Sequence, residues 1–219
     1  FGGSSNVIMR NLIFQGGTDT INTNGAHHLW FDHLDISDGS DGVLDITHES
    51  DFITVSYTKV WYARGGGHKN ACLVGNRDDA THDRGKMRVT FYKCWWADGV
   101  MERMPRVRYG KVHVLNNLYT AKGNEYCIAP GVHANILAER NIFIDVNRAL
   151  AADWYNSSDD AVLESVENVF LGSTTGTEGK KGTVPVFVPP YDYVADEPND
   201  ALEAEVRASA GATLNITPP

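Results

Sequence analysis

The chain has 219 residues, which is long enough for one domain with a substantial hydrophobic core. Its net charge of −9 and its pI of about 5.3 argue against a general nucleic-acid binder or a binder of anionic membranes. No apolar run approaches the roughly 20 residues that a membrane-spanning helix needs. The three cysteines, Cys72, Cys94 and Cys127, have no metal-ligand spacing, and we expect them to be buried as small hydrophobic side chains.

A degenerate repeat runs along most of the chain. In each copy, an apolar residue is followed seven positions later by another apolar or aromatic residue. The copies recur with a period of about 23 residues, and their alternation of apolar and polar residues predicts strands. This pattern predicts an all-β protein, a right-handed, single-stranded parallel β-helix (a solenoid) whose coils stack about 4.8 Å apart. The pairs are Val7/Phe14, Leu29/Ile36, Ile53/Val60, Val89/Trp96, Val112/Tyr119, Ile136/Phe143 and Leu163/Phe170.

Two further features belong to this repeat. Asn117, Asn141 and Asn168 occupy the same place in the last three copies, so we expect them to form a hydrogen-bonded ladder at a tight bend. One interval between copies is longer than the others, and its extra residues fall within 63–86, a stretch rich in Gly, Asp, His and Arg. Insertions in a solenoid bulge from one face, which is often the binding face.

The repeat fades in the C-terminal part of the chain. Residues 184–193 are proline-rich and are expected to pack in an extended form along the coils. Residues 196–200 contain good helix-capping side chains, and they predict a short helix over 201–210 that ends at Gly211.

We expect residues 1–219 to form a single β-helix domain, with coils over about 6–170 and a C-terminal extended segment and short helix over 171–219. The chain starts at Phe1 without a methionine or a signal peptide, which is typical of a mature form or a fragment. The copy that contains Val7 resembles an internal coil, so we expect N-terminal coils to be missing. An uncapped coil end is an exposed sheet edge, and an N-terminal fragment or a second chain is expected to cover it.

Charged residues occur at similar offsets in different copies. Asp19, Asp45 and Arg103 each precede the apolar start of the next copy by nearly the same number of residues. Stacking is therefore expected to bring them onto one lateral strip, over three coils or roughly 14 Å. Lys69 lies on the coil that this strip crosses. One face of the protein would then present carboxylates at one end and cationic groups at the other.

The carboxylates of this strip would raise one another's pKa unless a cation neutralised them. Oxygen donors without Cys or His favour a hard ion, so calcium is preferred to zinc. Asp41 precedes Asp45 by four residues, about 13 Å in an extended strand, so both can hold one ion only if the chain bends. Gly42 permits such a bend, and without it only one of the two is a direct ligand. Turn and capping roles for these aspartates are the alternative.

Three arginines, Arg103, Arg106 and Arg108, lie close together in an otherwise acidic chain. Such a density of fixed positive charge is costly unless an anion binds to it, although a solvated turn remains the alternative. Calcium can bridge substrate carboxylates to protein carboxylates while Arg and Lys hold the remaining charge. The combination predicts an anionic substrate.

Six motifs between about residues 6 and 170 together resemble the extracellular pectate lyases of polysaccharide lyase family 1. The resemblance implies a secreted parallel β-helix that cleaves α-1,4-linked polygalacturonate, the de-esterified form of pectin, by calcium-dependent β-elimination. In chain order, the motifs are Asp19-Thr20-Ile21, Leu29-Trp30-Phe31-Asp32-His33, Asp41-Gly42-Val43-Leu44-Asp45, Phe52-Ile53-Thr54-Val55-Ser56-Tyr57, Arg103-Met104-Pro105-Arg106-Val107-Arg108 and Asn116-Asn117-Leu118-Tyr119.

The resemblance also implies roles for individual residues. Arg103 matches the base that removes the C5 proton of the sugar, and a base of this type predicts an alkaline activity optimum. Arg108 matches a binder of the substrate carboxylate, and Arg106 and Lys69 are further substrate-binding candidates. The spacing after Lys69 is one residue longer than usual, so Asn70 is the alternative at the lysine position. The calcium ligands are matched by Asp19, Asp41 and Asp45.

Three other functions are alternatives to this one. A pectin lyase, which acts on methyl-esterified pectin without calcium, would lack a complete aspartate set. A non-catalytic polysaccharide-binding or adhesive β-helix would need no arginine cluster, so Arg103 and Arg108 argue against it. A β-helix glycoside hydrolase would need paired carboxylates as acid and base, and arginine-rich neighbours do not suit that pair.

Overall fold

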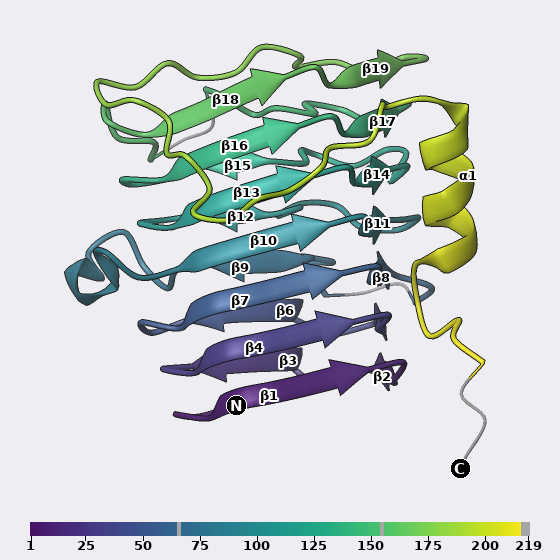
Figure 1. Ribbon diagram of the computed structural model, residues 1–219, viewed down its shortest axis with the longest axis horizontal. Coiled ribbons are helices and arrows are strands. Elements are labelled where there is room, and N and C mark those ends of the chain that lie inside the picture. The colour runs from purple at the N-terminus through teal and green to yellow at the C-terminus, as the bar shows by residue number, and fades with distance from the viewer. Residues whose placement is uncertain (65–66, 154–155, 216–219) are drawn as a thin grey trace.

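The computed structural model describes residues 1–64, 67–153 and 156–215, and its strands form three parallel sheets that stack around a common axis (Figure 1). Each full coil contributes one strand to each sheet in turn, so hydrogen-bonded neighbours are mostly three strands apart in the chain. This arrangement confirms the predicted all-β parallel β-helix.

The three sheets are numbered here by the order in which the chain first enters them. Sheet 1 has seven described strands: β1 (Ser5–Arg10), β4 (His27–Asp32), β7 (Asp51–Ser56), β10 (Arg88–Tyr92), β13 (Lys111–Leu115), β16 (Asn135–Glu139) and β18 (Val162–Val166). Sheet 2 also has seven: β2 (Ile13–Gln15), β5 (Asp35–Ser37), β8 (Lys59–Trp61), β11 (Trp95–Trp96), β14 (Leu118–Tyr119), β17 (Ile142–Ile144) and β19 (Val169–Leu171). Sheet 3 has five: β3 (Asp19–Asn24), β6 (Gly42–Thr47), β9 (Cys72–Val74), β12 (Arg106–Val107) and β15 (Ala129–Pro130).

The register of the sheets reproduces the sequence repeat. The first member of every predicted pair aligns with its counterparts in sheet 1, and the second member does the same in sheet 2. Inside sheet 2 the rings of Trp96, Tyr119, Phe143 and Phe170 form a continuous stack, with the centroids of Tyr119 and Phe143 4.3 Å apart. Burying each such ring stabilises the coil by about 1.5–3 kcal/mol. The three cysteines are buried, as predicted, and all three are free.

The asparagine ladder lies where the chain turns from sheet 1 into sheet 2. Asn141 Oδ1 accepts hydrogen bonds from the backbone and side-chain nitrogens of Asn117 at 2.8 and 3.0 Å. Asn168 Oδ1 accepts the equivalent pair from Asn141, both at 2.9 Å. The residue before each asparagine is left-handed, with φ of 55° at Asn116 and 48° at Arg140, and this conformation makes the bend. The predicted ladder is confirmed.

The expected insertion over residues 63–86 is two loops rather than one. β9, an ordinary strand of sheet 3, lies in its middle and separates residues 62–71 from residues 75–87. The second loop contains the short 3-10 helix Thr81–Asp83 and projects at the edge of the solenoid beside β9 and β10 (Figure 1). We call residues 76–86 the insertion loop below.

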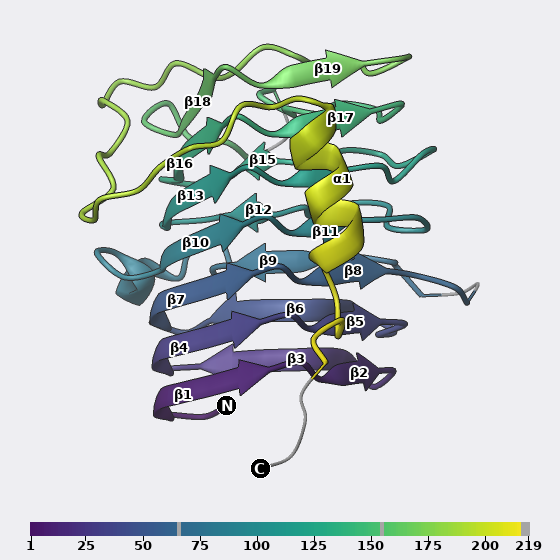
Figure 2. The ribbon, with the colours of Figure 1, turned by 45° about the vertical axis from the view of Figure 1, so that its right-hand side comes forward.

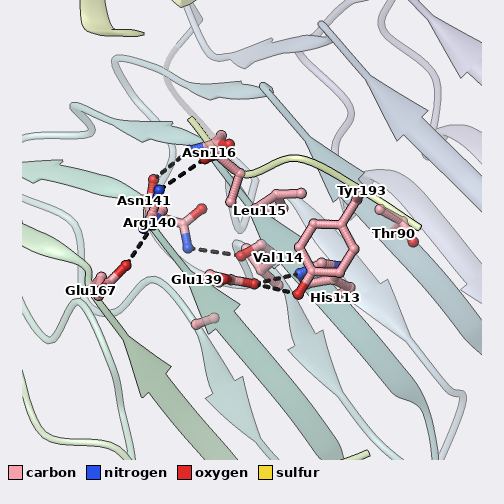
Figure 3. A network of polar contacts seen from close by, with 12 residues as sticks. Thr90, His113, Val114, Leu115, Asn116, Glu139, Arg140, Asn141, Glu167 and Tyr193 are labelled. Atoms are coloured by element: carbon pink, nitrogen blue, oxygen red, sulfur yellow. Dashed lines mark hydrogen bonds and ion pairs between the residues drawn. The ribbon is translucent and has the colours of Figure 1, made fainter. Parts of the chain in front are cut away.

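The C-terminal residues return along the outside of the coils, as predicted. Residues 183–199, called the strap here, cross the outer face of sheet 1 over β10, β13 and β16 (Figure 1). Tyr193 contacts Glu139, which also contacts His113, and Asn116 bonds to the backbone of Asp196 through both side-chain atoms (Figure 3). These contacts satisfy polar groups that would otherwise point into solvent from the sheet.

A helix, α1 (Asp200–Ser209), follows the strap and begins one residue earlier than predicted. Asn199 caps it by accepting hydrogen bonds from the backbone nitrogens of Ala201 and Leu202. Leu202 and Val206 are buried against sheet 2, where α1 lies across the short strands (Figure 2). No helix in the described ranges combines the length and the apolar character needed to cross a membrane.

The strands β1, β2 and β3 form one end of the stack (Figure 1). Among the described residues, β1 pairs with β4 alone, so its other edge carries unpaired backbone groups. Ile8, Leu12 and Ile13 are exposed at this end. The cover over this edge stays a prediction.

Candidate active site on sheet 3

The outward face of sheet 3 brings charged residues from different coils into one line. Asn22, Asp45, Leu73 and Arg106 are register partners in β3, β6, β9 and β12. Their sequence neighbours on both sides are buried in the core, so alternation directs these four side chains away from it. Asp45 and Arg106 therefore share one outward row, two coils apart.

Asp19 and Asp45 converge over the backbone of Gly42. A Cβ atom at Gly42 would lie 3.2 Å from Asp45 Oδ1 and 3.6 Å from Asp19 Oδ1. The backbone nitrogen of Leu73 donates to Asp45 Oδ1 at 3.2 Å, and Asn22 Nδ2 donates to Asp19 Oδ2 at 3.3 Å. Asp19 Oδ1 is buried and has no hydrogen-bond partner among the described residues. Two carboxylate oxygens thus face a space that glycine keeps open.

The electrostatics of the pair show a shortage of positive charge. Burial and the neighbouring Asp19 charge raise the pKa of Asp45 to about 7, while the Leu73 backbone hydrogen bond and the Arg103 charge act in the opposite direction. Asp41 adds to the repulsion. A buried carboxyl beside two other carboxylates favours a cation at this place, and its all-oxygen donors suit a hard one.

Asp41 lies at the rim of this group. The sharp turn before β6 is made at Gly39, where a Cβ atom would lie 1.9 Å from the carbonyl oxygen of Gly42. The backbone nitrogens of Val43 and Leu44 both donate to the carbonyl oxygen of Ala71, and Asp45 Oδ1 lies close to Gly42, so the start of β6 is not regularly extended. This agrees with the bend that the sequence permits near Gly42. The roles of Asp41 and Asp45 as calcium ligands both stay predictions. Within the described ranges no three His, Cys, Asp or Glu side chains form a ready metal cluster.

Arg103 completes the strip predicted from the sequence. Its backbone oxygen accepts a hydrogen bond from the nitrogen of Cys72 at 2.6 Å, and its φ of 65° is left-handed. Its Nε is buried and without a hydrogen-bond partner in the part of the chain that is described. Its charge acts on Asp45, which agrees with the expectation that stacking brings these two residues near each other.

The two candidates for the lysine position differ in their surroundings. Lys69 is half-buried, and its backbone oxygen accepts a hydrogen bond from Met101. Asn70 is buried, and its Nδ2 donates to the backbone oxygen of Asp41 at 2.7 Å. Asn70 therefore braces the loop that carries Asp41, a role that sequence reasoning missed.

The other two arginines of the cluster are largely buried. Arg106 is only 4% exposed and lies near Tyr126. Burial raises the pKa of Tyr126, and the charge of Arg106 acts to lower it. Arg108 Nε donates to Asp78 in the insertion loop, and its side chain is 15% exposed. Substrate binding by these two arginines stays a prediction. Asp78 was not among the predicted site residues, because nothing in the local sequence links it to Arg108.

The fold and this group of residues define a single-stranded parallel β-helix with an acidic and basic site on one sheet. A family model described as pectate lyase matches residues 1–212, and the chain therefore belongs to the pectate lyase family.

Individual relatives agree with this membership. Pectate lyase A of Aspergillus niger is 34% identical over 96% of this chain, and pectate lyase A of Dickeya chrysanthemi is 28% identical over 96%. The structure of a thermostable pectate lyase superimposes on 97% of the chain with a TM-score of 0.79 and 25% identity, and the chain covers 63% of it. The chain spans 64% and 63% of the length of the two relatives.

Proposed function

We propose that this chain carries the site of a calcium-dependent pectate lyase, which cleaves α-1,4-linked polygalacturonate by β-elimination. The observation that supports it is the convergence of Asp19 and Asp45, with an unpartnered carboxylate oxygen, beside Arg103, with an unpartnered Nε. Buried polar atoms of folded proteins are nearly always paired, so unpaired ones on one face favour a ligand there. The family and the names of the relatives support the same activity.

Asp19 and Asp45 would hold the calcium ion, with Asp41 as a third carboxylate at the rim. Bound there, calcium would supply positive charge that neutralises the aspartates and attracts a carboxylate of the polymer. The backbone nitrogen of Leu73 and the side chain of Asn22 orient the two carboxylates. Gly42 leaves the space between them open, and any side chain at that position would fill it.

Arg103 would act as the base. It takes the proton from C5 of the galacturonate ring, the electron pair forms the C4–C5 double bond, and the bond from C4 to the glycosidic oxygen breaks. The departing oxygen takes a proton from solvent, so the products are an unsaturated sugar and a new chain end. A guanidinium is ordinarily protonated at neutral pH, so we expect activity to rise into the alkaline range. A flat rate between neutral and alkaline pH would count against Arg103.

The remaining cations would bind the polymer. Arg108 and Lys69 would contact substrate carboxylates, and Arg106 would support them from below the surface. Because the proposed substrate is an extracellular polymer, we also propose that the protein is secreted, which product formation in the culture medium of its source cells would test.

One assay tests the proposal. The protein is incubated with polygalacturonate and with highly methyl-esterified pectin, each with calcium or with a chelator, and the ultraviolet absorbance of the unsaturated product is followed. We expect product from polygalacturonate in the presence of calcium and from none of the other three mixtures. Calcium-independent product from the esterified polymer would identify a pectin lyase, and no product from either polymer would favour a polysaccharide-binding protein. Both results would overturn the proposal.

A further inference from the structure

The insertion loop places a carboxylate on Arg108. Asp78 Oδ1 accepts a hydrogen bond from Arg108 Nε, and the two groups form an ion pair in which the side chains are 37% and 15% exposed. The backbone oxygen of Asn76 accepts a second bond from Arg108 Nη1 at 3.3 Å. The charge of Arg108 is therefore balanced by a residue of its own chain.

The surrounding contacts hold Asp78 at this position. The hydroxyl of Tyr109, the residue after Arg108, donates to the backbone oxygen of Asp78 at 2.5 Å. Asp83, which is fully buried, accepts hydrogen bonds from the backbone nitrogens of Glu49 at 2.7 Å and Asn76 at 3.4 Å. The insertion loop is thus fastened to the coils on both sides of Asp78, which distinguishes this carboxylate from a freely rotating surface group.

This pairing changes what Arg108 can select. An unpaired guanidinium binds a carboxylate through charge-assisted hydrogen bonds and binds its neutral methyl ester much more weakly. A guanidinium that is already neutralised offers less charge, and a second carboxylate beside it is repelled by the first. At such a subsite a methyl-esterified galacturonate loses little relative to the free acid.

We propose that Asp78 is a specificity-determining residue, which lowers the demand for a free carboxylate at the Arg108 subsite and lets the enzyme act on partly methyl-esterified galacturonan. The inference rests on the proposed function, in which Arg108 faces the polymer. It predicts a tolerance for esters that comes from the insertion loop and not from the calcium ligands.

The insertion loop supplies its own control residue. Asp79, next in the chain, pairs with Arg77 at 3.3 Å, and both side chains are more than 70% exposed. Asp78→Asn and Asp79→Asn remove the same charge from adjacent positions of the same loop. The hydrogen bond from the Tyr109 hydroxyl to the backbone oxygen of Asp78 does not involve the Asp78 side chain. The loop should therefore keep its place in both variants.

The experiment compares kcat/KM on polygalacturonate with kcat/KM on galacturonan of about one-third methyl esterification, at one pH and saturating calcium. In Asp78→Asn we expect the ratio of the first to the second to rise about three- to tenfold, because Arg108 regains its charge preference. In Asp79→Asn we expect a ratio within about twofold of the wild type. An unchanged ratio in Asp78→Asn, or a shift toward the esterified polymer, would overturn the inference.

A double-mutant cycle tests whether Asp78 changes the substrate preference through Arg108. In an Arg108→Ala background, adding Asp78→Asn should leave the ratio unchanged, because the charge that Asp78 balances is gone. An equal shift in both backgrounds would mean that Asp78 acts through the general field of the loop, which contradicts the inference.

Binding separates this inference from the proposed activity. Trigalacturonate and its trimethyl ester are titrated calorimetrically into Arg103→Ala and into Arg103→Ala/Asp78→Asn, with calcium present. The preference for the free acid should be larger in the double variant. If the wild type forms no unsaturated product, the proposed lyase activity is wrong but the role of Asp78 in binding is not affected. If the two variants show equal preferences for the free acid, the role of Asp78 is wrong but the proposed activity is not affected.

Discussion

The outer faces of sheet 1 and sheet 3 are built from the same repeat, yet they treat polar groups in opposite ways. On sheet 1 the strap bonds to Thr90, His113 and Asn135, so the chain itself satisfies the side chains that point outward. On sheet 3, Asp19 Oδ1 and Arg103 Nε are buried and find no hydrogen-bond partner in the described ranges. Polar side chains that the strap pairs serve stability, whereas we expect the buried atoms of sheet 3 that lack a partner to meet a ligand.

Replacing Arg103 tests this contrast with the largest expected effect. Arg103→Ala should lower kcat on polygalacturonate by about 10²–10⁴-fold, because a positioned base is lost. The melting temperature should stay within a few degrees, since Arg103 Nε has no hydrogen-bond partner among the described residues. Arg77→Ala, an exposed arginine of the insertion loop, is the control and should keep full activity. Full-speed turnover by Arg103→Ala would contradict its role.

Replacing Asn141 tests how much a fully paired polar group, here in the asparagine ladder, contributes to stability. Asn141→Ala removes a fully buried amide that bonds to Asn117, Asn168 and the backbone of Val114. We expect the free energy of unfolding to fall by about 2–4 kcal/mol, measured by urea denaturation. Asn168→Ala, at the half-buried end of the ladder, should cost less. Equal losses would mean that the ladder does not gain from its interior position.

Replacing Asp45 separates the cost of repulsion from the gain of ligand binding. In chelator, Asp45→Asn should be as stable as the wild type or more so, because the repulsion with Asp19 is gone. In calcium at about a hundred times the wild-type Kd, the wild type should gain about 2.7 kcal/mol and the variant almost nothing. Thermal melting in both buffers measures the difference. An equal calcium-induced shift in both proteins would exclude Asp45 as a ligand.

Lowering the pH tests how the strap is held, with the smallest expected effect. Burial lowers the pKa of His113, with Glu139 opposing, and the rings of Tyr191 and Tyr193 also face it. The folded state thus favours the neutral imidazole more than the unfolded state does, and the unfolded state takes up a proton below about pH 6.5. Stability is fully present above that pH and should fall on acidification by at most about 1.4 kcal/mol per pH unit.

Urea denaturation at several pH values measures this slope. His113→Gln should remove the part of the slope that comes from the imidazole, and the carboxylates should account for the rest. A wild-type slope that the substitution leaves unchanged would mean that His113 does not carry it.

The sequence predicted the coils well because stacking forces equivalent side chains into one line. Once Leu29 and Ile53 are placed at the same position of successive strands, the register of the whole sheet follows. The same logic placed Asp19 and Asp45 near each other, since both lie on strands of sheet 3.

The contacts of the loops could not be predicted in this way, because loop residues bond to residues that have no fixed spacing from them in the sequence. The tight turn at Gly39, where a Cβ atom would lie 1.9 Å from the carbonyl oxygen of Gly42, was not predicted from the sequence. The bond from Asn70 to Asp41 and the pair of Asp78 with Arg108 depend on how two loops lie against neighbouring coils.

The C-terminal residues reach farther along the stack than any single coil does. The backbone around Phe187 bonds to Asn135 in β16, the nitrogen of Gly211 bonds to Tyr57, and Leu214 bonds to Asn11 in the first coil. In a solenoid whose coils touch only their neighbours, the ends can fray one step at a time. Here the C-terminal residues contact coils at both ends of the stack, so loosening either end also breaks contacts several coils away. We therefore expect the coils to unfold together rather than one at a time.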